Sequence, residues 1–314
     1  NDKIFNNLGH ICEIQNDFQI AEKYYKKAID LNKKNMIPRH NLINLQLKTS
    51  DWSNIDNYIK LFKDQNSFHK YGLPINLHAI LDDPNLQKYC NENFLSYEPK
   101  CKIYKSSNII NPKIKIGYFS ADFSDNNPVS YLIKDLIKYH DRRKFEIYGF
   151  SLKGAPKKDT TIKYYEEQFD KFFNLEVLDD KEIKNLCSTL NLDLAIDLNG
   201  YTQNSRPTIF SHRLAPIQVN FLGYPGTLGS KNYHYIIADR IVIPEKLKKY
   251  YSEKIVYLPE TYFVNPSDRP ASKRSFTKDE FSIPQSSFVY CCFNQNYKIF
   301  SNVFDVWMNI LKAV

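Results

Sequence analysis

The stretch that decides the fold is Lys113-Ile-Lys-Ile-Gly-Tyr-Phe-Ser120, in which apolar and polar side chains alternate. Alternation with a period of two predicts a β-strand that turns one face toward a core. Residues 129–139 then show helical spacing, and residues 144–151 predict a second strand. A strand, a helix and a strand in succession indicate a parallel crossover. This part of the chain is therefore predicted to be an α/β domain.

The same alternation of helix and strand continues toward the C-terminus. A helix is expected at 179–190, and short apolar segments predict further strands at 194–198, 217–221, 234–238 and 254–258. Together these elements predict a doubly wound, Rossmann-like sheet that occupies residues 113–283.

A second α/β domain is expected to begin at 284–314 and to be cut short. Phe288–Phe293 is predicted to be a buried strand, and a helix is expected after Ser301. The adjacent Cys291 and Cys292 lie in this strand, where successive side chains point to opposite faces. We therefore expect buried thiols and no zinc site.

The first 96 residues have helical spacing throughout. Phe5, Leu8 and Cys12 share one helical face, Asn16-Asp17 interrupts the pattern, and a second face with small residues begins at Ala21. This spacing resembles a tetratricopeptide repeat, whose period is about 34 residues, although a plain helical hairpin is the alternative. A polar, irregular linker is expected at 97–112, between the helices and the sheet.

Composition limits the classes of partner. The chain has 314 residues, 42% of them hydrophobic, and 43 Lys+Arg against 35 Asp+Glu give a net charge of +8. The basic residues are scattered among acidic ones, which does not favour a nucleic-acid surface. No apolar run approaches the roughly 20 residues of a membrane-spanning helix. We expect no nucleic acid and no membrane partner, and give some weight to partners that carry phosphate.

Ligands of an open parallel sheet bind outside the carboxyl ends of its strands. The most Gly-rich loop there is Leu222-Gly-Tyr-Pro-Gly-Thr227, which lacks the glycine spacings of dinucleotide and P-loop sites. Its glycines permit close approach of the backbone to a ligand, or to other parts of the protein. A ligand contact and a purely structural loop are both open at this point.

A second polar segment, Phe293-Asn-Gln-Asn-Tyr-Lys298, precedes the predicted C-terminal helix. Backbone N–H groups at a helix start favour phosphate, and Lys298 adds a fixed positive charge that could stabilise a departing diphosphate. A solvated surface lysine is the alternative.

Six motifs occur in the order found in the O-GlcNAc transferases of glycosyltransferase family 41, and the chain resembles the bacterial members of that family. They are Lys115-Ile-Gly-Tyr-Phe-Ser-Ala-Asp-Phe123, Asp197-Leu-Asn-Gly-Tyr-Thr202, Leu214-Ala-Pro-Ile-Gln218, Leu222-Gly-Tyr-Pro-Gly-Thr227, Tyr251-Ser-Glu-Lys254 and Phe293-Asn-Gln-Asn-Tyr-Lys298. The resemblance covers nearly the whole chain, which would then be truncated at both ends.

The resemblance implies a GT-B enzyme, with two Rossmann-like domains around a sugar-nucleotide cleft and tetratricopeptide repeats that present protein substrates. Such an enzyme transfers N-acetylglucosamine from UDP-GlcNAc to Ser or Thr hydroxyls with inversion. It uses no metal and no cofactor beyond its donor substrate. A cytoplasmic location is expected by the same resemblance, and this fragment alone is expected to be inactive.

The resemblance also assigns residues. Lys298 matches the lysine that contacts the diphosphate and supports the leaving group, and it is the candidate catalytic residue. The candidate donor-binding residues are Gln295, Tyr297, Gly223, Tyr224, Pro225, Gly226, Thr227 and Thr202.

Two family histidines are missing. Asn127 stands where a candidate catalytic base is common, and an amide does not accept a proton near neutral pH. Asp193 stands at the second position. Asn127 is therefore predicted to position acceptor or donor, with the acceptor proton passing to a donor phosphate or water, unless this member is impaired. His212 and His234 are nearby but are expected to be structural.

Two alternatives stay open. The same fold with a different donor, GDP-fucose or a UDP-hexose, would carry the same motifs. A catalytically degenerate adaptor, in which the helical repeats bind proteins and the transferase domain is inactive, would explain Asn127. Retention of Lys298 with its neighbours favours the enzyme.

Overall fold

The computed structural model describes residues 1–63, 75, 78, 80–94, 112–125, 127–154, 158–268 and 272–314. The chain divides into two compact units, and each is described by itself. The helical unit combines residues 1–58 with residues 267–314, and the sheet unit comprises residues 59–266. The predicted linker at 97–112 lies outside the described residues except for Pro112. No described helix has both the length and the apolar character that a bilayer crossing requires.

The helical unit begins with an antiparallel hairpin, as the sequence predicts. Its helices are α1 (Asp2–Ile14), α2 (Phe18–Leu31) and α3 (Ile37–Lys48), and α4 (Ile55–Lys63) begins in this unit and crosses its boundary at residue 58. Asn16 ends the first helix in the left-handed region (φ 64°), which lets the chain reverse. Gly9 lies against the ring of Tyr25, because a Cβ at Gly9 would stand 2.7 Å from that ring. Tyr25 and Ala21 are fully buried between the helices.

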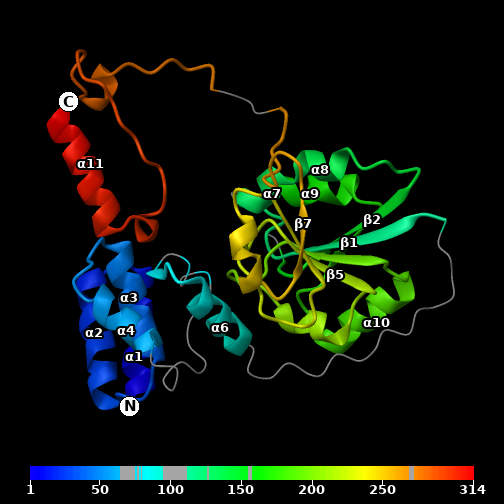
Figure 1. Cartoon of the computed structure of the whole chain (residues 1–314), viewed down its shortest axis with the longest axis horizontal. Helices are drawn as coiled ribbons and strands as arrows, with labels where there is room; N and C mark the ends of the chain where they lie inside the picture. The colour runs from blue at the N-terminus through cyan, green and yellow to red at the C-terminus, as the bar shows by residue number, and fades with distance from the viewer. Residues whose placement is uncertain are drawn as a thin grey trace. The chain divides into compact units, whose positions relative to one another are not determined.

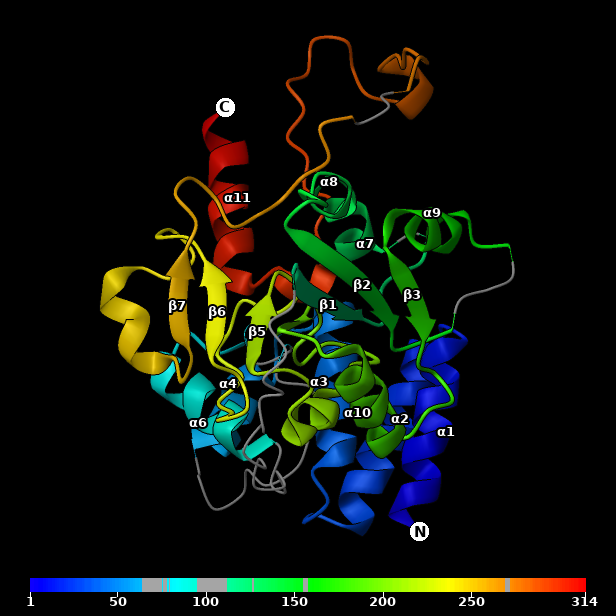
Figure 2. The ribbon, with the colours of Figure 1, turned by 90° about the vertical axis from the view of Figure 1, so that its right-hand side faces the viewer.

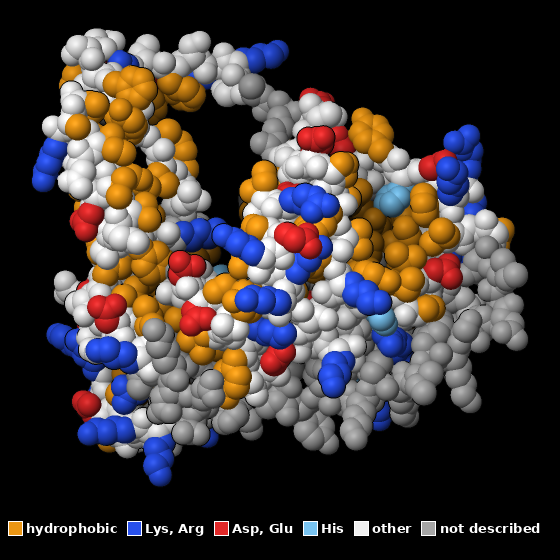
Figure 3. Space-filling view, viewed as in Figure 1, with side chains coloured by type: hydrophobic (Ala, Val, Ile, Leu, Met, Phe, Trp, Pro, Cys, Tyr) orange, Lys and Arg blue, Asp and Glu red, His pale blue; other side chains and the backbone are white. Residues whose placement is uncertain are grey.

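The C-terminal residues belong to the same unit. They form the short 3₁₀ turns η3 (Asp279–Phe281) and η4 (Asn296–Lys298) and the helix α11 (Ser301–Ala313). The indole of Trp52 donates a hydrogen bond to the Ile299 carbonyl (3.0 Å), and its ring lies 5.8 Å from that of Phe304. Hydrophobic side chains are exposed along α11 (Figure 3).

The predicted strand at Phe288–Phe293 is wrong. These residues form no strand, and the side chains of Phe288 and Phe293 are 80% and 96% exposed. A strand needs a neighbour to satisfy its backbone N–H and C=O groups, and no described strand lies beside this segment. Cys291 and Cys292 are likewise exposed, which corrects the expectation of buried thiols.

The sheet unit contains seven parallel strands in the order β3-β2-β1-β4-β5-β6-β7 (Figure 2). The strands are β1 (Ile114–Ser120), β2 (Phe145–Ser151), β3 (Lys171–Asn174), β4 (Leu194–Asp197), β5 (Ile217–Phe221), β6 (Tyr235–Ala238) and β7 (Lys254–Tyr257). The predicted doubly wound architecture is confirmed. The short strand β3 was not expected from the sequence.

Helices cover both faces of the sheet (Figure 1). They are α6 (Pro84–Phe94), α7 (Pro128–Leu132), α8 (Lys134–Lys138), α9 (Thr160–Gln168) and α10 (Asp180–Leu190), with 3₁₀ turns η1 (Pro207–His212) and η2 (Glu245–Tyr250). Alternate side chains of β1 enter different cores. Phe119 shares one core with Ile183 of α10, whereas Tyr118 shares the other with Ile137 of α8 and Tyr165 of α9.

The strand order places a topological switch point between β1 and β4. From β1 the chain builds outward through β2 to β3, and it then returns to the other side of β1 to continue with β4. The connections at the carboxyl ends of β1 and β4 therefore diverge and leave a crevice, where ligands of such sheets bind. The loops after these two strands are the first place to look for a site.

Candidate functional site at the switch point

The side chain of Asn199 joins the two loops at the switch point. Its Oδ1 accepts a hydrogen bond from the Ala121 backbone N–H (2.6 Å), and its Nδ2 donates to Asp122 Oδ2 (2.7 Å) and Thr202 Oγ1 (3.0 Å). Asn199 follows β4, whereas Ala121 and Asp122 follow β1. The Asn199 amide therefore links the predicted site residue Thr202 to the carboxylate of Asp122.

The β4 loop is itself fixed by a buried carboxylate. Asp197 accepts hydrogen bonds from the N–H groups of Asn199 (2.9 Å) and Gly200 (3.0 Å) and from the Tyr233 hydroxyl (2.6 Å). Gly200 has φ +57°, a conformation that glycine adopts without a steric penalty. Burial raises the pKa of Asp197, and the Tyr233 hydrogen bond acts in the opposite direction.

Asp122 is a site residue that sequence reasoning missed. Burial raises the pKa of its carboxyl group, while hydrogen bonds from Asn199 and Asn127 lower it. The side chain keeps partial solvent access. A carboxylate that is held by amides at the mouth of a crevice is suited to accept hydrogen bonds from a sugar or an acceptor hydroxyl. Two signals in the sequence could have found it: its position directly after β1 and its place in the motif that ends at Phe123.

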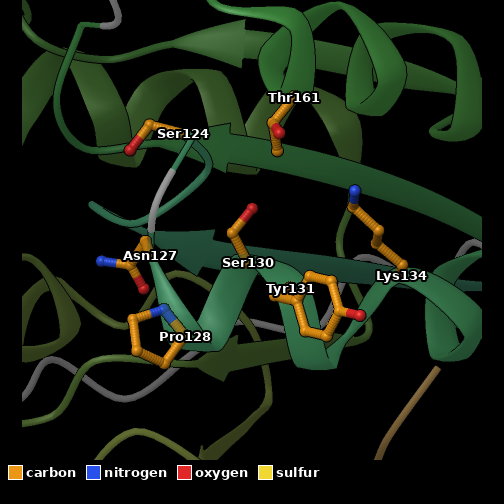
Figure 4. A pocket seen from close by; sticks show the side chains of 7 residues that line it. All are labelled: Ser124, Asn127, Pro128, Ser130, Tyr131, Lys134 and Thr161. Carbon is orange, nitrogen blue, oxygen red and sulfur yellow. The ribbon is translucent and has the colours of Figure 1, made fainter. Parts of the chain in front are cut away.

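Asn127 begins α7. Its Oδ1 accepts a hydrogen bond from the Val129 N–H (2.9 Å), so the amide caps the helix as well as contacting Asp122. It also borders a pocket of about 340 Å³ on the sheet unit (Figure 4). The predicted positioning role of Asn127 stays a prediction, but the structure places this residue beside the switch-point carboxylate.

The Gly-rich loop after β5 is held from inside the protein. A Cβ on Gly223 would stand 2.0 Å from the Leu198 carbonyl oxygen, so only glycine fits there. Tyr224 is fully buried, and its hydroxyl donates to Asn91 Oδ1 (3.2 Å) and lies 2.8 Å from His78 Nε2. Burial lowers the pKa of His78 to about 4, so this imidazole is neutral at pH 7.

A buried carboxylate closes the other end of the loop. Glu253 accepts hydrogen bonds from the Thr227 hydroxyl and from the Leu228 N–H, both at 2.6 Å. Tyr251 donates to the Pro225 carbonyl (3.1 Å). The five predicted residues of this loop therefore lie together. Tyr224, Gly226 and Thr227 are buried, and Gly223 and Pro225 keep partial exposure.

The predicted diphosphate site lies in the helical unit. Gln295 and Lys298 are exposed, Tyr297 is half-buried, and Lys298 Nζ lies 5.8 Å from the centre of the Tyr297 ring. The turn that carries them directly precedes α11, and the Asn296 amide donates to the Lys48 carbonyl (3.4 Å). The predicted donor-binding residues are thus divided between the two units, because Thr202 and the Gly-rich loop belong to the sheet unit.

Within the part of the chain that the structure describes, His212 and His234 make no hydrogen bond to the residues of the switch-point cluster. The ring of His234 accepts a hydrogen bond from the Gln218 N–H (2.9 Å) and contacts Arg213, as a structural histidine does. Burial lowers its pKa. His212 ends η1 and is half-buried. Over the described ranges, no three His, Cys, Asp or Glu side chains are grouped so that they could hold a metal ion.

Comparison with protein families now identifies the chain. The model of glycosyl transferase family 41 matches residues 87–270 and 265–314. The chain belongs to glycosyltransferase family 41. A tetratricopeptide repeat model matches residues 3–35, which confirms the interpretation of the α1–α2 hairpin as such a repeat.

Family 41 relatives match the chain over part of their length. A probable UDP-N-acetylglucosamine–peptide N-acetylglucosaminyltransferase of Arabidopsis thaliana, SEC, is 33% identical over 213 residues, which make up 64% of this chain and 21% of that protein. A Caenorhabditis elegans UDP-N-acetylglucosamine–peptide N-acetylglucosaminyltransferase is 34% identical over 154 residues, 48% of this chain and 13% of that protein. The chain thus corresponds to about a fifth or less of these relatives.

A solved structure supports the GT-B-like fold of family 41. A mutant of the Thermobaculum terrenum O-GlcNAc transferase matches with a TM-score of 0.77 and 23% identity. The match covers 100% of this chain and 60% of that one. Helical repeats followed by a doubly wound sheet unit are therefore an architecture that the two chains share.

Proposed function

We propose that the protein transfers N-acetylglucosamine from UDP-GlcNAc to Ser or Thr hydroxyls of other proteins. Membership of family 41 carries the proposal, since the matched relatives are named for this reaction. The bridge from Asn199 to Asp122 supports it, because it places polar side chains at the crevice where a doubly wound sheet binds its ligand.

The proposed roles follow from the family motifs that these residues match. Lys298 supplies a positive charge for the diphosphate that leaves, and Gln295 and Tyr297 flank the nucleotide. Thr202 and the partly exposed backbone of Gly223 and Pro225 line the donor. A positive charge placed where negative charge develops on the leaving diphosphate lowers the activation barrier of transfer, so Lys298 is the candidate catalytic residue. The proposal includes no metal and no cofactor.

The proposed acceptors are proteins. The α1–α2 hairpin belongs to a repeat family whose stacked units form extended concave binding surfaces. We therefore assign presentation of polypeptides to the helical repeats, and the sugar nucleotide to the catalytic region.

A donor panel tests the proposal. The full-length protein is incubated with an acceptor lysate and, in separate reactions, UDP-GlcNAc, UDP-hexoses and GDP-fucose, and protein-bound sugar is measured by mass spectrometry. We expect the mass of N-acetylhexosamine on Ser or Thr with UDP-GlcNAc. Transfer of only another sugar would instead favour the same fold with a changed donor. No transfer from any donor, together with capture of proteins by the repeats, would favour the adaptor.

A further inference from the structure

The proposed function assigns no role to the pocket next to Asn127. It has a volume of about 340 Å³ and lies between the α7–α8 segment and the start of α9 (Figure 4). This volume is within the range of small-molecule sites. Seven residues line the pocket, and all of them except Pro128 carry a polar group in the side chain: Ser124, Asn127, Pro128, Ser130, Tyr131, Lys134 and Thr161.

The pocket contains a buried hydroxyl that lacks a partner. Ser130 is 2% exposed, and its Oγ makes no hydrogen bond to any part of the chain that the structure describes. Figure 4 shows this hydroxyl directed into the space among Ser124, Thr161 and Lys134. Its backbone carbonyl, in contrast, accepts a hydrogen bond from Tyr165. A buried hydroxyl without a partner costs free energy, which a ligand that accepts or donates a hydrogen bond would recover.

The pocket also contains a cation, Lys134, for which the described residues supply no counter-ion. Lys134 lies one helical turn after Ser130 and is half-buried, and no carboxylate among the described residues lies within ion-pair distance of its ammonium group. The Nζ atom of Lys134 lies 5.7 Å from the centre of the Tyr131 ring and 5.3 Å from the centre of the Tyr164 ring. An ammonium group and a free hydroxyl on one wall are complementary to an anionic oxygen.

The charge around the pocket favours a singly charged ligand. Asp125 contacts the lining residue Thr161, from whose hydroxyl (2.5 Å) and N–H (3.1 Å) it accepts hydrogen bonds. This carboxylate would repel a doubly charged phosphate, and Lys134 is the only basic side chain among the residues that line the pocket. A carboxylate carries one charge and satisfies both Lys134 and Ser130.

We propose that this pocket binds one carboxylate of the acceptor polypeptide, an Asp or Glu side chain close to the Ser or Thr that receives the sugar. The assignment of the ligand to an acceptor rests on the proposed function. Asn127 connects the pocket to the switch point, since it lines the pocket and contacts Asp122. The pocket would then give the enzyme a preference for acidic acceptor sequences.

Peptide binding tests the proposal without requiring transfer. Fluorescent Ser-containing peptides that carry a single Glu, scanned through the flanking positions, are compared with the matched Gln peptides by anisotropy with the full-length protein and no donor. We expect at least one position at which Glu binds about tenfold more tightly than Gln, since a charge-assisted hydrogen bond has this effect. No preference at any position would overturn the proposal, as would tighter binding of the matched phosphoserine peptide.

Variants link the preference to the pocket. Lys134→Met keeps the aliphatic stem and Ser130→Ala removes the unpaired hydroxyl, and each should abolish most of the preference for Glu. Ser130→Ala should also leave the melting temperature unchanged or higher, because it deletes an unsatisfied group. The matched control is Lys138→Met, an exposed lysine of the same segment that does not line the pocket.

The outcomes separate the pocket from the function. Equal loss of preference in Lys138→Met would reduce the effect to general surface charge and overturn the assignment. An intact preference in wild type that is lost in both pocket variants, together with no sugar transfer from any donor, would count against the proposed function and leave the carboxylate site standing.

Discussion

Lys298 is the residue on which the proposed chemistry depends most. We expect Lys298→Ala in the full-length protein to lower kcat/KM about 100-fold, because an electrostatic donor of this kind contributes about 3 kcal/mol to the transition state. Steady-state transfer assays measure the change. Lys312→Ala, which removes another lysine of the C-terminal region, is the matched control and should be neutral. A wild-type rate in correctly folded Lys298→Ala protein would refute the assignment.

Asn127 combines two tasks that different substitutions separate. Its Oδ1 caps α7, and its side chain contacts Asp122. Asn127→Ala removes both and should cost about 1 to 3 kcal/mol of transition-state binding, with an additional loss of roughly 1 kcal/mol of stability from the missing cap. Asn127→Ser keeps a capping oxygen and should restore stability without restoring the rate.

The pH–rate profiles of these Asn127 variants test the missing base. Because an amide does not ionise in this range, no limb of the profile should disappear in Asn127→Ala. If Asn127→Ala transfers sugar at the wild-type rate, or if Asn127→His is faster than wild type, the positioning role is wrong and the position has been lost to catalysis.

At the scale of elements, the loop after β5 depends on the close passage of two backbones. Gly223→Ala would place its Cβ 2.0 Å from the Leu198 carbonyl oxygen, so either β4 or the loop must move. We expect roughly 1 to 3 kcal/mol lower stability, as in other overpacked sites. Gly154→Ala is the matched control. Its Cβ would contact the end of the flexible Glu176 side chain, which can move away, so we expect a smaller loss of stability. Urea unfolding measures the stability of both variants. An equal loss of stability in Gly223→Ala and Gly154→Ala would show that the close passage at Gly223 has no special cost.

The same loop gives the protein a pH-dependent component of stability. Burial raises the pKa of Glu253 above its usual 4.5, so the folded state holds the proton more tightly than the unfolded state. Its contribution is fully present below pH 4.5 and is lost as the pH rises through the raised pKa. Glu253→Gln should remove this fall in the free energy of unfolding.

Urea unfolding at several pH values, from below 4.5 to neutral, measures the effect of Glu253→Gln. Glu245→Gln is the control of opposite sign, because Lys248 lowers the pKa of the exposed Glu245. A pH dependence that is identical in wild type and Glu253→Gln would show that this carboxylate does not contribute.

Some elements of this fold could be predicted from the sequence, and others could not. β1 was predicted because its side chains alternate between apolar and polar, and β4 because it is a short apolar segment between a helix and a polar loop. β3, at the edge of the sheet, has the sequence Lys-Phe-Phe-Asn, and its two apolar residues between polar ones are too few to indicate a strand. The bridge from Asn199 to Asp122 spans 77 positions and exists only through the pairing of β1 with β4. Phe288–Phe293 has the composition of a strand but no described partner.

At the scale of the whole molecule, the predicted site residues are divided between two units. Lys298 belongs to the helical unit, and Thr202 belongs to the sheet unit. The chain covers 60% of the Thermobaculum terrenum structure that it matches. We therefore expect the 314-residue chain alone to transfer no sugar and to bind UDP weakly, as isothermal titration and the transfer assay would measure. Turnover near the rate of the full-length protein would contradict this expectation.

The contact of Trp52 with Ile299 and Phe304 has a consequence for synthesis on the ribosome. Because the helical unit is built from both ends of the chain, residues 1–58 leave the exit tunnel long before residues 267–314 are made. The sheet unit is continuous in sequence, and domains generally fold as units during translation. During translation the N-terminal helices therefore lack the contacts of Trp52 with Ile299 and Phe304. These contacts form only after the intervening sheet unit has been synthesised.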